Sequence, residues 1–138
     1  MSVVTELIRT EADGTISFGN YELAAKTKKE NFEFEGDLYK VKTFSDLTGL
    51  EKNELFVYES EPGTAVAGLK ETADGMEFRV EGTGDSQITV ECEPETAYDI
   101  YLDGELRDTQ KSNLGGKISF SAELMTDRAL SVRIVRHV

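Results

Sequence analysis

The chain contains no tryptophan, one cysteine, one histidine and two prolines among its 138 residues. With a single cysteine, Cys92, an intramolecular disulfide is impossible, so the fold depends on its apolar core. No apolar run is long enough to span a membrane, and the first residues lack the basic and apolar regions of a signal peptide. These absences predict a cytoplasmic protein.

Positive charge is also scarce. The 15 Lys and Arg residues are outnumbered by 27 Asp and Glu residues, for a net charge of −12. A negative field repels phosphate backbones and anionic lipids, so we expect neither nucleic acid nor a membrane as a partner. Lys26, Lys28 and Lys29 form the one basic cluster, in a segment that we expect to be a solvated loop, with an anion site as the alternative.

What the chain has in abundance is alternation of apolar and polar residues. A period of two places one set of side chains on a buried sheet face and the other in water. Several such segments separated by turn residues predict an all-β protein, and more specifically an antiparallel β-sandwich or barrel. The alternating apolar residues are Met76, Phe78, Val80, Ile88, Val90, Cys92, Tyr98, Ile100, Leu102, Ile118, Phe120, Ala122, Leu124, Leu130, Val132 and Ile134.

The first half carries weaker versions of the same pattern. Gly36-Asp37 is a hairpin turn signal between two alternating segments. Within residues 43–53 we expect one helical turn, capped by Ser45. Pro62-Gly63 is the seam that we predict between two units, a smaller N-terminal β lobe at residues 1–62 and a β-sandwich at residues 63–138.

One segment is apolar on both faces. Leu55, Phe56, Val57 and Tyr58 follow one another without a polar residue. Such a strand must be covered on both sides, either within the fold or at a subunit contact. These four residues are therefore our candidates for an interface, with a homo-oligomer or another protein as the partner.

A local motif runs from Cys92 to Ile100. Pro94, Thr96 and Tyr98 follow an apolar residue at two-residue steps, which resembles the corner between two strands of fibronectin type III domains. The resemblance implies a fibronectin III or Ig-like sandwich in which Tyr98 packs inward and its hydroxyl contacts upstream backbone. The chain departs from the family in having Cys92 in place of leucine and no buried tryptophan.

Three other segments, Phe18–Tyr21, Tyr58–Val66 and Asn113–Lys117, resemble small cytoplasmic proteins of Gram-positive anaerobes, some of which are named endosialidase. That name implies hydrolysis of a sialylated polymer. Sialidases resemble one another in an arginine cluster for the sugar carboxylate, a tyrosine nucleophile and Asp-box repeats. This chain has no Asp box and its six arginines are scattered, so we do not expect the activity.

Signals for other chemistry are missing. The only histidine, His137, is the penultimate residue, and no HExxH, paired cysteines, phosphate loop or nucleophile elbow is present. We predict no enzymatic activity, no metal and no cofactor. The interpretation we favour is a non-catalytic protein-interaction or self-assembly module. The alternative is a carbohydrate-binding module that uses Tyr101 and Tyr21, and a sialidase-type glycosidase has the least support.

Overall fold

The computed structural model describes residues 3–138, which form thirteen strands and no helix. No helix that could cross a membrane is therefore found among them. All strand pairs are antiparallel and belong to two sheets. The seven-stranded sheet has the spatial order β1 (Ile8–Thr10), β2 (Ile16–Phe18), β7 (Thr64–Thr72), β8 (Gly75–Gly82), β13 (Leu130–Arg136), β10 (Ala97–Leu102) and β11 (Glu105–Lys111). The six-stranded sheet has the order β12 (Lys117–Glu123), β9 (Asp85–Glu91), β6 (Leu55–Glu61), β5 (Leu47–Lys52), β4 (Asp37–Phe44) and β3 (Thr27–Phe34).

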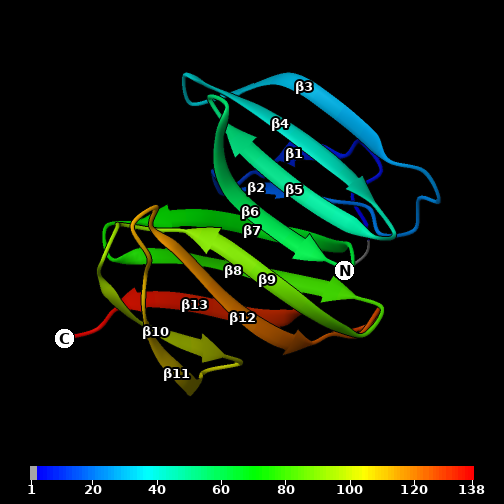
Figure 1. Cartoon of the computed structure of the whole chain (residues 1–138). Coiled ribbons are helices and arrows are strands. Elements are labelled where there is room, and N and C mark those ends of the chain that lie inside the picture. The colour runs from blue at the N-terminus through cyan, green and yellow to red at the C-terminus, as the bar shows by residue number, and fades with distance from the viewer. Residues whose placement is uncertain (1–2) are drawn as a thin grey trace.

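The two sheets pack face to face, with the core between them (Figure 1). Tyr58 is at the centre of the core, and its ring meets Phe18 and Phe78 edge to face at centroid distances of 5.3 and 5.6 Å. Such edge contacts are the preferred geometry of aromatic pairs. The alternating residues of β8, β9 and β12 point into this core as their period predicts, and the all-β sandwich is confirmed.

Each sheet combines strands from both sides of residue 62. The seven-stranded sheet places β2 beside β7, and the six-stranded sheet places β6 beside β9. The hydrogen-bonded sheets thus do not divide the chain at Pro62, which lies in the short connection between β6 and β7.

The helical turn expected within residues 43–53 is wrong, because β4 and β5 form a hairpin there. The buried residues of this hairpin follow a period of two, and they are Tyr39, Val41, Thr43, Thr48 and Leu50. The hydroxyls of Thr43 and Thr48 lie 2.8 Å apart, and Thr48 also donates to the carbonyl of Thr64 at 2.9 Å. These buried polar contacts hold the two strands together where a helical turn was expected.

The solvated loop expected around the lysine cluster is also wrong in part. Thr27–Phe34 forms β3, an edge strand of the six-stranded sheet, and Lys28 and Lys29 are exposed on it. A register shift between Lys29 and Phe32 bulges this strand. Lysines and bulges on an edge strand discourage pairing with another chain, so the basic cluster has a structural explanation.

Candidate functional site

The segment that is apolar on both faces owes this pattern to a bulge. In the pairing of β5 with β6, Leu50 faces Tyr58 and Glu51 faces Phe56, so Val57 is an extra residue. A bulge lets two consecutive side chains turn to the same side. Val57 and Tyr58 are both buried as a result, and of the four interface candidates only Leu55 and Phe56 reach the surface.

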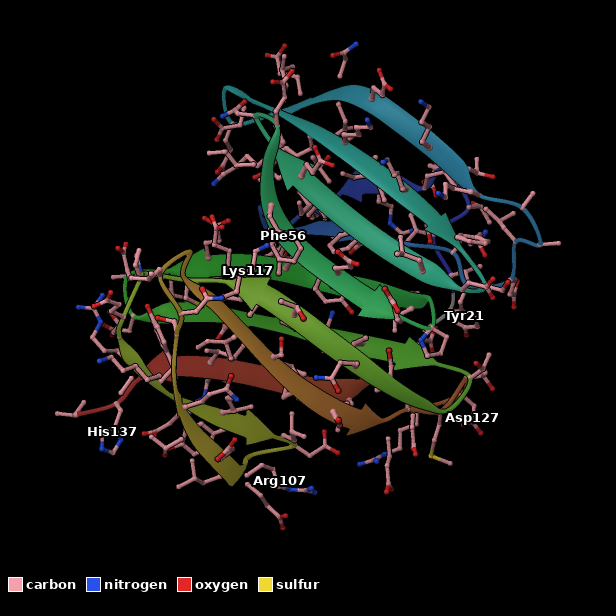
Figure 2. All side chains as sticks on the ribbon, viewed as in Figure 1. Tyr21, Phe56, Arg107, Lys117, Asp127 and His137 are labelled. Carbon is pink, nitrogen blue, oxygen red and sulfur yellow. The ribbon has the colours of Figure 1, made fainter. Side chains whose placement is uncertain are left out.

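Leu55 and Phe56 lie at one open end of the sandwich. Leu55 is 66% exposed, whereas Phe56 is half-buried beneath Lys117, whose Nζ lies 4.3 Å from the ring centroid (Figure 2). Both residues border a cavity of about 260 Å³ between the sheets. Its apolar lining also includes Val57, Met76, Cys92 and Tyr98.

Charges at this end are more balanced than in the chain as a whole. Glu71, Glu91 and Glu93 border the cavity, and Lys52 Nζ lies 3.1 Å from Glu71 Oε2. Lys117, which covers Phe56, is the cross-strand partner of Glu91. Two lysines thus face three carboxylates here, in a protein whose net charge is −12.

Cys92 lies in the wall of the cavity. Burial, with Glu71, Glu91 and Glu93 nearby, raises the pKa of its thiol to about 11. The thiolate is the reactive form of cysteine, so this thiol is a poor nucleophile at neutral pH.

The corner residues form one contact group at the same end. Tyr98 is buried, and its hydroxyl accepts a hydrogen bond from the Glu93 N–H at 3.0 Å. Thr96 Oγ1 donates to the carbonyl of Pro94 at 2.9 Å. This is the backbone contact that the resemblance to fibronectin type III implies for Tyr98, and the corner carries the chain from β9 in one sheet to β10 in the other.

The two tyrosines predicted to bind a ligand, Tyr21 and Tyr101, differ in their exposure to solvent. Tyr21 is buried, so its ring offers no platform to a sugar. Tyr101 is half-buried on the outer face of the seven-stranded sheet, beside a hollow of about 340 Å³ that Arg79 and Arg133 also line. The guanidinium carbon of Arg133 lies 4.4 Å from the Tyr101 ring centroid, so one face of the ring is already covered.

Glu81 is buried, although the alternating pattern of its strand predicts that it faces solvent. Glu77, Arg79 and Glu81 form the outward set of β8, yet Glu81 is 0% exposed. Neither of its carboxylate oxygens has a hydrogen-bond partner among the described residues. Burial is the largest effect on the pKa of Glu81 and raises it, the positive charge of the N-terminus lowers it, and the carboxylates of Asp127 and Glu22 raise it. No local signal could have found this residue, because segments distant in sequence bury it.

His137 is ordered against β10. Its Nδ1 lies 2.9 Å from Asp99 Oδ1, and the same oxygen accepts a hydrogen bond from Thr109 Oγ1 at 2.7 Å. The carboxylate therefore sits between the imidazole and the hydroxyl, whereas nucleophilic catalysis places the imidazole between the other two. These contacts tie the C-terminal segment to the sheet.

Within residues 3–138, no group of three or more His, Cys, Asp or Glu side chains has the geometry to hold a metal ion. Comparison with protein families, with curated proteins and with solved structures finds no match to this chain.

Proposed function

We propose that the protein is a non-catalytic interaction module that associates with a second copy of itself through the open end around Leu55. The observation that carries this proposal is an exposed leucine at the rim of a cavity whose walls combine apolar side chains with charged ones. In a twofold-symmetric dimer the same patch of both copies is in contact. A protruding side chain next to a cavity can therefore insert into the cavity of the other copy. Leu55 of each copy enters the cavity of the other.

Charge at this end opposes self-association less than the net charge of the chain suggests. Two lysines offset two of the three carboxylates, which lowers like-charge repulsion between copies at this end. The remaining net charge of −12 per copy still opposes association. Salt screens such repulsion, so the dimer strengthens as ionic strength rises.

The native mass of untagged protein tests the proposal, by size exclusion with light scattering at low and high salt. We expect a dimer that Leu55→Lys converts to a folded monomer. Leu106→Lys is the matched control, because Leu106 is 56% exposed on β11 and does not border the cavity. A monomer at every salt concentration, or an unchanged mass of Leu55→Lys, contradicts the proposal.

Carbohydrate binding is a second candidate, favoured by the hollow beside Tyr101 on the outer face of the seven-stranded sheet. One face of the Tyr101 ring and the guanidinium of Arg79 are available to a ligand there. Titration of a glycan panel against the wild type and Tyr101→Ala tests it. Binding that the variant retains in full excludes this tyrosine as the platform.

The Tyr98 corner supports a fibronectin III-like arrangement, a fold that implies no activity of its own. The resemblance to proteins named endosialidase supports only the weakest proposal, turnover of a sialylated polymer. Its test is an assay on purified protein, and we expect no turnover.

A further inference from the structure

The exposed sheet edges differ in how they are protected from pairing with another chain. β1 has only three residues, and β3 carries lysines and a bulge. Short, charged or bulged edges are the usual means by which proteins avoid unwanted strand addition. β11 and β12 are the edge strands on the remaining side of the sandwich (Figure 1).

The hydrogen bonds at the two ends of β12 establish which of its residues face outward. Cys92 N donates to Gly116 O at 2.7 Å, and Leu124 N donates to Gly84 O at 3.2 Å. Bonding to β9 alternates along an antiparallel ladder, so the even-numbered residues between these two bonds face β9. The odd-numbered residues present their N–H and C=O groups to the free edge, and these are Lys117, Ser119, Ser121 and Glu123.

Side chains occupy the first half of this edge. The N–H of Lys117 donates to Asn113 Oδ1 at 2.9 Å. Gln110, on β11, binds both main-chain groups of Ser119: its Oε1 accepts from the Ser119 N–H at 3.1 Å, and its Nε2 donates to the Ser119 carbonyl at 2.9 Å. The side-chain amide of Gln110 thus makes the two hydrogen bonds with Ser119 that a residue of a neighbouring strand would make.

The second half of the edge is open. The outward N–H and C=O groups of Ser121 and Glu123 have no hydrogen-bond partner within residues 3–138. Beside them lies a groove of about 900 Å³ that runs between the ends of the two sheets. Met125 is 55% exposed in its wall. The apolar side chains deeper in the groove are Leu102, Ala122, Leu124 and Leu130.

We propose that this groove binds an extended segment of another protein, which adds as a short strand beside Ser121 and Glu123. Alternating N–H and C=O groups at the spacing of a β-ladder are complementary to an extended polypeptide, which pairs with them by strand addition. Successive side chains of an added strand point to opposite faces, so every second one enters the groove between the sheets. The segment supplies an apolar side chain there.

The partner is a flexible segment and not a second copy of the chain. Two β12 edges could pair only over Ser121 and Glu123, because Gln110 already occupies Ser119. Contact over two residues per copy falls far short of the roughly 1,200 Å² that a stable interface buries. The net charge of −12 favours a neutral or basic segment.

This inference rests on the proposed function, since it names a partner of the interaction module, but it uses the opposite end of the strands. Leu55, at the start of β6, lies on the side of Glu91, whereas Ser121 and Glu123 pair with Gln87 and Asp85. Methionine methyl groups report on each end separately: Met76 lines the cavity beside Leu55, and Met125 lines the groove.

The test uses acetylated, amidated hexapeptides with lysine at both ends and valine, leucine, phenylalanine or tyrosine at alternate inner positions. We expect binding to shift the NMR signals of the Met125 methyl and of the Ser121 and Glu123 amides, and to protect those two amides from hydrogen exchange. The Met76 methyl does not shift. Methylation of the peptide nitrogens that pair with β12 abolishes binding.

Two variants at one position provide the matched pair. Ser121→Pro removes the unpaired N–H, which an edge strand tolerates because no ladder bond is lost. It weakens peptide binding about fivefold to tenfold, the value of one net hydrogen bond. Ser121→Ala keeps the N–H and binds as the wild type does.

Three results would overturn the inference. No peptide shifts these NMR signals, the N-methylated peptides bind as well as the unmethylated ones, or Ser121→Pro binds the peptides as tightly as Ser121→Ala and the wild type do. If the dimer mediated by Leu55 persists while no peptide binds, only the strand-addition proposal fails. If the peptides bind but no dimer forms, the proposed self-association fails and the peptide site stands.

Discussion

Glu81 offers the sharpest prediction about stability. It is a carboxylate that is 0% exposed and has no hydrogen-bond partner among the described residues. The nearby carboxylates of Glu22 and Asp127 carry the same negative charge as Glu81 and raise its pKa. Burial raises the pKa of Glu81 in the folded state above the value of about 4.3 for an unfolded glutamate.

The sign of the pH dependence follows from this shift. Between the unfolded and the raised folded pKa, the folded protein binds more protons than the unfolded chain, so stability falls as pH rises through this window. The contribution of Glu81 is most favourable below about pH 4.3, and it is lost once pH exceeds the folded pKa. Glu81→Gln abolishes this titration. The variant therefore matches the wild type near pH 4 and becomes more stable than the wild type at pH 7.

The expected gain of Glu81→Gln at pH 7 is about 1 kcal/mol, because an unsatisfied buried charge costs more than an unsatisfied neutral polar group, which costs about 1–3 kcal/mol. For a chain of this length, each kcal/mol raises the melting temperature by about 3 °C. Glu81→Met, which also removes the unsatisfied polar atoms, gains more than Glu81→Gln. The assay is urea denaturation of all proteins between pH 4 and 8.

Glu77→Gln is the matched control. Glu77 lies on the same face of β8 but remains half-exposed, so its substitution leaves stability at pH 7 within about 0.5 kcal/mol of the wild type. The reasoning is refuted if Glu81→Gln is less stable than the wild type at pH 7, or if its advantage is the same at pH 4.

Three further predictions concern contacts of single side chains. The raised pKa of Cys92, about 11, predicts alkylation by iodoacetamide at pH 8 roughly a hundredfold slower than that of a free cysteine, and a rate equal to that of a model thiol would contradict it. Tyr98→Phe leaves the Glu93 N–H without its acceptor, and we expect a loss of about 1 kcal/mol in urea denaturation; no loss would mean that water replaces the hydroxyl. Gln110→Ala frees both main-chain groups of Ser119, so we expect light scattering to show increased self-association, and unchanged scattering would count against an edge-protecting role.

The period of two was enough to predict most strands of the fold. Met76, Phe78 and Val80 on β8 are buried as predicted, because one face of each sheet must cover the core. The hairpin predicted at Gly36-Asp37 connects β3 to β4, and its turn lies one residue earlier, at Glu35-Gly36, where both residues have positive φ. Local pattern and local geometry agree in these segments.

The failures share a non-local cause. The bulge at Val57 depends on the register between β5 and β6, which the apolar run at Leu55–Tyr58 does not encode. Thr43 and Thr48 are strand residues because their buried hydroxyls meet each other across the hairpin. The cover over Glu81 and the bond from Gln110 to Ser119 both join residues that only the folded chain brings together.

The measurement that tests the interaction at the open end most directly is methyl NMR of methionine-labelled protein over a dilution series. Met76 lines the cavity that we propose Leu55 of the second copy enters, and Met125 lies at the opposite end of the strands. We predict that the Met76 signal shifts with concentration, that the Met125 signal does not, and that Leu55→Lys holds both at their dilute positions. A Met76 signal that is independent of concentration, or one that shifts equally in Leu55→Lys, would contradict the proposed association.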